Sequence, residues 1–252
     1  TLELDGPIKN RPVILDEELW VLSGEKLIGL GLRSGRLLNR QLELPRSSCV
    51  SNPILIHSED GKEQVALASS DWEGGIMLLD THKLESKIYA NCEIGPVHKE
   101  MSMAEDSHGI FISDIYGSLH VFTLKTMKIT ASIQLSSNPL SAATILDKST
   151  IVVGSYNGRL YCVRYDEEQG QLEKHWECDC YSAVYSKPLK FNEVSVVVCT
   201  TAGCLKKISI QSGEMESFLN IPAEIWSSPV QVGQTNLVAV GARDSRCHIV
   251  SI

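Results

Sequence analysis

Two cysteine pairs are the residues of this sequence whose types and spacing most suggest chemistry. Cys178 and Cys180 flank Asp179, and the two-residue period of a β-strand places both thiols on one face. A zinc site needs four ligands, usually from two closely spaced pairs, and the sequence has no second pair of this kind. Cys199 and Cys204 flank a predicted hairpin turn, where a redox switch or two ordinary core thiols would both fit. We therefore expect no metal ligands, and redox chemistry stays open only at this second pair.

Other residue patterns suggest phosphate binding or acid–base catalysis, but their surroundings favour structural roles. The stretch Gly29–Gly35 is rich in glycine, yet a dinucleotide-binding loop must open a helix, and no helical period follows. Asp71, Asp114 and Asp244 lie in predicted turns, whose geometry aspartate tolerates. Ser155 lacks the strand-to-helix elbow of a hydrolase nucleophile. We expect no catalytic residue in this chain.

The composition is that of a soluble globular protein, with 43% hydrophobic and 21% charged residues. The net charge of −8 argues against a nucleic-acid partner, and no apolar run approaches the roughly 20 residues of a membrane span. The eight cysteines lie mostly in apolar runs and no signal peptide is visible, so we expect reduced thiols, a cytoplasmic location and a monomeric domain. Because residue 1 is not methionine, we expect a piece of a longer polypeptide.

A repeat of about 42 residues organises the chain. Its clearest landmark is a tight turn between two apolar runs, as in Tyr156-Asn157-Gly158-Arg159, where Asn-Gly is a strong hairpin signal. The turn recurs at Gly75, Gly117, Gly158, Gly203 and Ser245, with spacings of 42, 41, 45 and 42 residues. Prolines that precede the first strand of a repeat keep a similar period, with 41 residues from Pro12 to Pro53 and from Pro188 to Pro229.

Four short strands in each repeat predict an all-β fold, a β-propeller rather than a sandwich. We expect one domain over residues 1–252, with blades at about 6–44, 45–93, 94–135, 136–181, 182–221 and 222–252. The last repeat ends after three strands, so residues 1–5 are expected to add its fourth strand and close a six-bladed ring. A fragment of a seven-bladed ring would show the same leading strand and remains the alternative.

The repeat resembles the pyrroloquinoline-quinone-like (PQQ-like) repeat of quinoprotein dehydrogenase-like propellers. Its best copy is Gly154-Ser155-Tyr156-Asn157-Gly158-Arg159-Leu160-Tyr161-Cys162, with Trp176 on the outer strand. The last third of the chain is similar to the C-terminal propeller of the β-alanine-activating enzyme family, also called aminoadipate-semialdehyde dehydrogenase-like or acyl-CoA synthetase family member 4. The segments that carry this similarity are Tyr181-Ser182-Ala183-Val184-Tyr185-Ser186-Lys187-Pro188, Gln211-Ser212-Gly213-Glu214, Ile221-Pro222-Ala223-Glu224-Ile225-Trp226-Ser227-Ser228-Pro229-Val230 and Gly241-Ala242-Arg243-Asp244.

The resemblance implies a parent enzyme that activates β-alanine with ATP and holds it as a thioester on a phosphopantetheine carrier. In that family the propeller follows an adenylation domain and a carrier domain, whose phosphate-binding loop and carrier motif are not present in this sequence. ATP and phosphopantetheine are therefore expected only in the parent, an ATP-dependent acid–thiol ligase. Quinone-dependent dehydrogenases with this repeat use a vicinal Cys-Cys disulfide, which this chain lacks, so no PQQ is expected.

A binding or scaffold role is the function that these observations favour. The expected partners are the parent's adenylation and carrier domains or another protein. We place the binding residues on loops that carry aromatic side chains, which make good anchors: Trp72, Tyr116, Tyr156 and Trp226. The same side chains would also fit between blades as packing residues. Two further alternatives stay open: a free-standing cytosolic scaffold, and an enzyme with a small-molecule site in the propeller channel.

Overall fold

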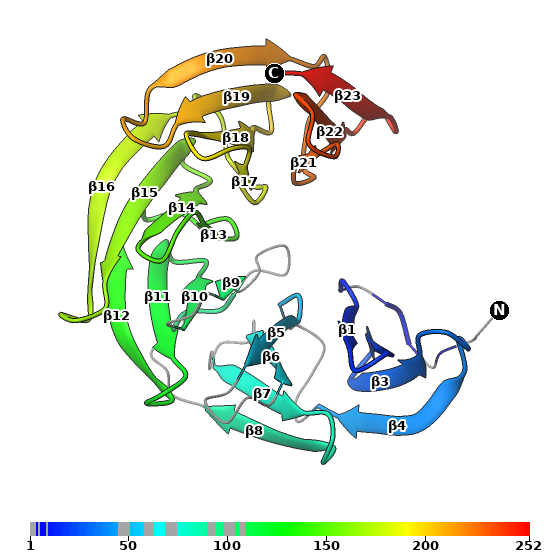
Figure 1. Cartoon of the computed structure of the whole chain (residues 1–252). Coiled ribbons are helices and arrows are strands. Elements are labelled where there is room, and N and C mark those ends of the chain that lie inside the picture. Colours follow the sequence, from blue (N-terminus) through cyan, green and yellow to red (C-terminus); the bar gives the residue numbers. More distant parts are fainter. Residues whose placement is uncertain are drawn as a thin grey trace.

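A computed structural model describes residues 4, 6–8, 10–44, 51–57, 63–68, 75–89, 94–97, 104–105 and 109–252. These residues form six antiparallel sheets that follow one another along an arc (Figure 1). The first three sheets contain β1 (Val13–Leu15), β2 (Glu18–Ser23), β3 (Lys26–Gly31) and β4 (Leu37–Glu43); β5 (Ile54–His57), β6 (Glu63–Ala68), β7 (Ile76–Asp80) and β8 (Glu85–Tyr89); and β9 (Ala104–Glu105), β10 (Ile110–Ser113), β11 (Ser118–Thr123) and β12 (Lys128–Gln134). The last three contain β13 (Thr144–Ile145), β14 (Thr150–Gly154), β15 (Arg159–Asp166) and β16 (Gln171–Asp179); β17 (Leu189–Lys190), β18 (Ser195–Cys199), β19 (Cys204–Ser209) and β20 (Met215–Asn220); and β21 (Val230–Gln231), β22 (Leu237–Gly241) and β23 (Cys247–Ser251).

Each sheet is a simple meander whose strands pair in chain order, which confirms the predicted all-β propeller fold. The first strand of each sheet lies on the inner side of the arc and the last strand on its outer side (Figure 1). We call the sheets the first to sixth blades. The described residues include no helix long and apolar enough to cross a bilayer.

Successive blades pack face to face, so the middle strands of a blade are covered on both sides. All five side chains of β18 are buried: Val196 and Val198 face the fourth blade, while Val197 and Cys199 face the sixth. The outer strand β16 instead alternates between half-buried and exposed positions over most of its length. A continuous apolar run is expected for a strand covered on both faces, and alternation for a strand with one face in water.

The turns between the second and third strands explain the repeated glycines. Gly117, Gly158 and Gly203 have φ values of 89°, 84° and 84°, a region that side-chain-bearing residues rarely adopt. A Cβ at Gly203 would also clash with the backbone oxygens of Ile221 and Ala223. At Gly117 and Gly203 the glycine is therefore required both by the turn and by the next segment packed against it, whereas Ser245 takes this position in the sixth blade with a φ of 63°.

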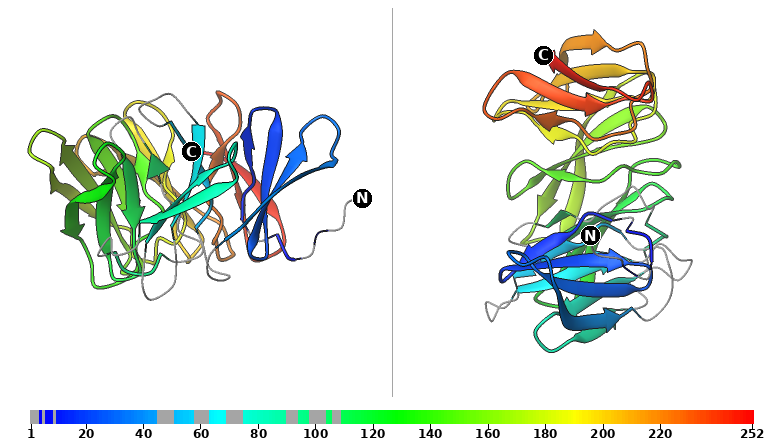
Figure 2. Two further views of the ribbon diagram at one scale, coloured as in Figure 1. Left: turned by 90° about the horizontal axis from the view of Figure 1, so that it is seen from below. Right: turned by 90° about the vertical axis from the view of Figure 1, so that its right-hand side faces the viewer.

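The sixth blade shows one covered and one uncovered face. Val238 and Val240 pack on the fifth blade, whereas Val230 and Ile249 point the other way and are each 61% exposed. The first and sixth blades stand apart at the two ends of the arc, as Figure 1 and the right-hand view of Figure 2 show. The described part of the sixth blade therefore has three strands, and its face turned away from the fifth blade is exposed.

Leu4 packs on the face of the first blade that is turned away from the second blade, against side chains of β2 and β3. Residues 1–3 and 5 lie outside the described residues. The closure of the sixth blade by residues 1–5 therefore stays a prediction, as do the blade boundaries and the single-domain organisation.

Candidate functional site

The structure places three of the four predicted binding residues, because Trp72 lies outside the described residues. Tyr116 is in the β10–β11 turn, is 50% exposed and lies against Gly95. Tyr156 is in the β14–β15 turn and is half-buried, and Trp226 precedes β21 and is 39% exposed. The fold brings Tyr156 and Trp226 into one cluster, whereas Tyr116 lies apart from it, against Gly95.

Tyr185 joins these two residues into what we call the aromatic row: Tyr156, Tyr185 and Trp226. The ring centroids of Tyr156 and Tyr185 are 5.1 Å apart, and those of Tyr185 and Trp226 are 4.9 Å apart. Trp226 Nε1 donates to Glu224 Oε2 at 3.0 Å, and the Arg243 guanidinium lies 4.8 Å from its ring. The row thus connects loops of the fourth, fifth and sixth blades, and its Trp226 end contacts the side chains of Glu224 and Arg243.

Sequence reasoning missed Tyr185 although a signal was present. Tyr185 stands three residues before Pro188, as Trp226 stands three residues before Pro229. The two residues are therefore equivalent positions in successive repeats. Their rings touch because neighbouring blades set equivalent loops side by side.

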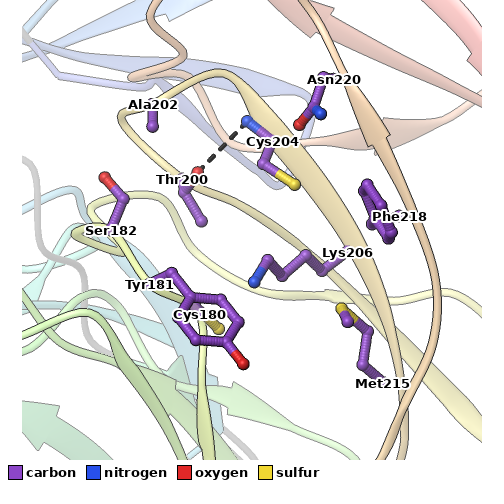
Figure 3. A pocket seen from close by; sticks show the side chains of 10 residues that line it. All are labelled: Cys180, Tyr181, Ser182, Thr200, Ala202, Cys204, Lys206, Met215, Phe218 and Asn220. Carbon is purple, nitrogen blue, oxygen red and sulfur yellow. Dashed lines mark hydrogen bonds between the residues drawn. The ribbon is translucent and has the colours of Figure 1, made fainter.

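A pocket of about 310 Å³ opens between the fourth and fifth blades (Figure 3). The segment after β16, the β18–β19 turn and the strands β19 and β20 supply its walls. The lining residues are Cys180, Tyr181, Ser182, Thr200, Ala202, Cys204, Lys206, Met215, Phe218 and Asn220. Tyr181 and Phe218 are 79% and 61% exposed, so the mouth of the pocket is aromatic.

Lys206 is the charged group of this pocket and is only 4% exposed. Its Nζ lies 4.3 Å from the centroid of the Tyr181 ring. Among the described residues no carboxylate pairs with this ammonium and no group accepts a hydrogen bond from it. Lys207, on the opposite face of β19, instead has its Nζ 3.6 Å from Glu216 Oε2. Most of the Lys206 side chain is buried, and its charge also acts on the nearby thiols of Cys178 and Cys204. A cation without a paired carboxylate is a candidate binding group for an anion, because burying a charge is costly unless the charge is paired.

The thiols next to the pocket differ in acidity. A hydrogen bond with Cys180 and the nearby Lys206 charge lower the pKa of Cys178 to about 7, although burial opposes the shift. The hydrogen bond with Cys178, together with burial, raises the pKa of Cys180, and burial raises that of Cys204. Cys178 is therefore the thiol with the larger thiolate fraction near neutral pH.

The other cysteine pair of the sequence does not meet. Cys199 packs toward the sixth blade, whereas Cys204 lines the pocket on the side of the fourth blade. Burial also raises the pKa of Cys199 to about 12, so this thiol stays protonated. The described residues hold no group of three or more side chains suited to a metal ion.

A Ser–His–Asp array connects two parts of the third blade. His120 Nε2 lies 3.1 Å from Asp114 Oδ2, and its Nδ1 lies 2.8 Å from Ser132 Oγ. The array ties the outer strand β12 to the β10–β11 turn, and both Asp114 and His120 are buried. A second Asp–His pair, Asp244 and His248 at 2.9 Å, joins the corresponding turn of the sixth blade to β23, so this contact recurs in two blades.

The six antiparallel blades define the chain as a β-propeller protein, and solved structures agree. A computationally designed protein, Ika8, has a TM-score of 0.74 at 16% identity, over 99% of this chain and 73% of that one. BamB from Moraxella catarrhalis has a TM-score of 0.74 at 17% identity, over 100% and 72%. The C-terminal WD40 domain of Sif2 has a TM-score of 0.71 at 14% identity, over 93% and 64%. Identities this low show the fold alone.

At the level of sequence, the chain is similar to β-alanine-activating enzymes. It is 26% identical to the enzyme of Drosophila melanogaster over 172 residues, and 26% identical to that of Homo sapiens over 152 residues. These matches cover 62% and 58% of this chain but only 17% and 13% of the two enzymes. No protein-family profile matches the sequence. The predicted resemblance to one part of this larger enzyme is thereby confirmed.

Proposed function

We propose that this chain is the binding propeller of a larger enzyme that activates β-alanine. In this proposal other domains of a cytoplasmic polypeptide bind ATP and carry phosphopantetheine, as in an acid–thiol ligase. The propeller performs no chemical step and docks the carrier domain through the aromatic row. The similarity to three enzymes named for β-alanine activation supports the enzyme context.

The observation that carries the docking role is the fixed, half-exposed Trp226 at the end of the aromatic row. Its indole donates to Glu224 and lies under Arg243, while Tyr185 supports its ring. A Trp held in place before binding loses little side-chain entropy on association. Tryptophan, tyrosine and arginine are also the residue types that dominate interface energies. The row therefore has the composition and rigidity of a docking site.

A tethered partner suits such a small anchor. If the carrier domain precedes the propeller in the same polypeptide, the linker sets a high effective concentration, and a weak contact is enough for docking. A single well-packed aromatic anchor contributes about 2 kcal/mol, which corresponds to roughly 30-fold in affinity.

The test uses the polypeptide that carries this chain, with Trp226→Ala compared with Val194→Ala, an exposed residue in the β17–β18 turn. ATP–pyrophosphate exchange measures activation of β-alanine, and transfer of the loaded β-alanine from the carrier measures the later step. We expect Trp226→Ala to slow transfer at least tenfold and to leave exchange unchanged. Equal transfer by the two variants would refute docking through the row, and loss of exchange in Trp226→Ala would contradict a role confined to the carrier.

A further inference from the structure

We propose that the pocket between the fourth and fifth blades binds a carboxylate group joined to an apolar body, with Lys206 as the pairing cation. The pocket is lined by side chains of β19 and β20, and none of the three residues of the aromatic row lines it (Figure 3). This site goes beyond the proposed docking role, and either proposal can fail without the other.

The equivalent position in other blades shows what Lys206 lacks. This position lies three residues after the recurring turn residue. In the second blade it holds Leu78, an apolar residue. In the third, fourth and sixth blades it holds a polar side chain: His120, Tyr161 and His248. Each of these side chains has a polar partner in its own turn. The partners and distances are Asp114 at 3.1 Å, Asn157 at 2.7 Å and Asp244 at 2.9 Å.

In the fifth blade the corresponding turn positions hold Thr200 and Ala202. Ala202 has no polar side chain, and Thr200 Oγ1 accepts from the backbone N–H of Cys204 at 3.2 Å. Lys206 is thus left without the turn partner that its polar equivalents have, and both turn residues line the pocket (Figure 3). An anion that enters the pocket would take the place of this missing polar partner, which is a carboxylate in the third and sixth blades.

The rest of the pocket fits a carboxylate with an apolar extension. The side chains of Ser182, Thr200 and Asn220 offer neutral hydrogen-bond donors around a single cation. Met215 and Phe218, with Tyr181, supply the apolar surface at the mouth. A phosphate dianion is usually held by several cationic or backbone N–H donors, so a monoanion matches this donor set better. The volume, about 310 Å³, is at the small end of the range for ligand sites.

Cys178 provides an internal reporter of this binding. The Lys206 charge is one of the causes that lower the pKa of Cys178 to about 7, after the hydrogen bond with Cys180. A bound carboxylate would pair with that charge and weaken its effect on the thiol. Alkylation of Cys178 at neutral pH should therefore slow when the pocket fills, because the thiolate is the reactive form.

The test titrates the full chain with 3-phenylpropionate and, separately, with its uncharged amide. The ¹³C-methyl signal of Met215 reports filling of the pocket, and iodoacetamide alkylation reports the reactivity of Cys178. Lys206→Met removes the charge and keeps the length of the side chain, and Lys207→Met is the matched control on the opposite face of the strand. A hydrogen bond to a charged group contributes about 1.5–3 kcal/mol, so we expect Lys206→Met to weaken acid binding at least tenfold.

Three results would support the proposal together: the acid shifts Met215, the amide binds at least tenfold more weakly, and Lys207→Met behaves as the unsubstituted chain. A further experiment uses a peptide with one glutamate between apolar residues, because a small-molecule acid and a glutamate side chain both present a carboxylate. The probe that binds more tightly shows which of the two kinds of ligand the pocket prefers. Phe218→Ala is a second test variant in case Lys206→Met does not fold, because Phe218 is exposed. It should weaken binding severalfold. Equal binding of acid and amide, unchanged binding by Lys206→Met, or no binding of either acidic probe would overturn the proposal.

Discussion

Removal of the Asp114 carboxylate should destabilise the propeller more than removal of other turn carboxylates. Asp114 is 2% exposed and accepts hydrogen bonds from the backbone N–H groups of Gly95, Tyr116 and Ser118 at 3.0, 3.0 and 2.9 Å. It also contacts His120 Nε2 at 3.1 Å. Asp114→Ala therefore leaves three backbone donors and one imidazole without their acceptor.

The magnitude follows from these four contacts. A buried donor that loses its partner costs about 1–3 kcal/mol, and entering water would recover part of that loss at the partly exposed donors. We expect a net loss of about 3–5 kcal/mol, a large share of the 5–15 kcal/mol typical of a folded domain. With a urea dependence of about 3 kcal/mol per molar, the unfolding midpoint should fall by about 1 M or more.

Urea unfolding followed by tryptophan fluorescence measures this shift. Asp244→Ala is the matched control, because Asp244 also contacts a histidine and a turn N–H group but is exposed. Its unfolding midpoint should stay close to that of the unsubstituted chain. If the two variants shifted the midpoint equally, or if Asp114→Ala left it unchanged, the reasoning from buried turn contacts would be refuted.

Three further expectations concern pH, backbone geometry and thiol reactivity. Burial alone would raise the pKa of Asp114, but hydrogen bonds from His120 and from backbone N–H groups hold it below its ordinary value of 3.8. As the pH falls, the Asp114 carboxylate therefore becomes protonated in the unfolded chain before it does so in the folded chain. The stability of the unsubstituted chain relative to Asp114→Asn should be greatest above about pH 4 and should decrease as the pH falls further. Urea titrations at several pH values measure this difference. Gly203→Ala should lower the free energy of unfolding by about 2 kcal/mol or more, because a Cβ meets backbone oxygens there. Gly233→Ala is the control: Gly233 also has a positive φ but lies in open space, so the loss of stability in thermal melts should be smaller. Iodoacetamide should alkylate Cys178 with a midpoint near pH 7 and leave Cys162, whose pKa burial raises to about 12, unmodified in the folded chain, as peptide mass spectrometry would show.

The fold was predictable because its determinants are local. The turn at Gly158 needs a left-handed residue, and the apolar runs beside it need cover on both faces, so the period is visible in the sequence. The shared face of Cys178 and Cys180 followed from the two-residue period of a strand, and both side chains contribute to the same core. Each of these features depends on a few neighbouring residues.

The candidate sites were less predictable because they depend on how blades stack. Lys206 and Lys207 are adjacent in the sequence, and only the packing of β19 decides which one is buried beside Tyr181 and which one pairs with Glu216. Likewise Tyr185 becomes part of the aromatic row only when the fifth and sixth blades set their loops side by side. An alignment of the repeats within this one chain shows both positions, because it reveals where Lys206 replaces a residue that has a turn partner.

Photo-crosslinking at Trp226 tests the proposed binding role most directly. A benzoyl-phenylalanine at position 226 of the polypeptide that carries this chain, with the same group at Val194 as control, reports what contacts the aromatic row. The account predicts crosslinks from position 226 to the carrier domain and none from position 194. Crosslinks from both positions to the same sites, or from position 226 to no other part of the polypeptide, would contradict it.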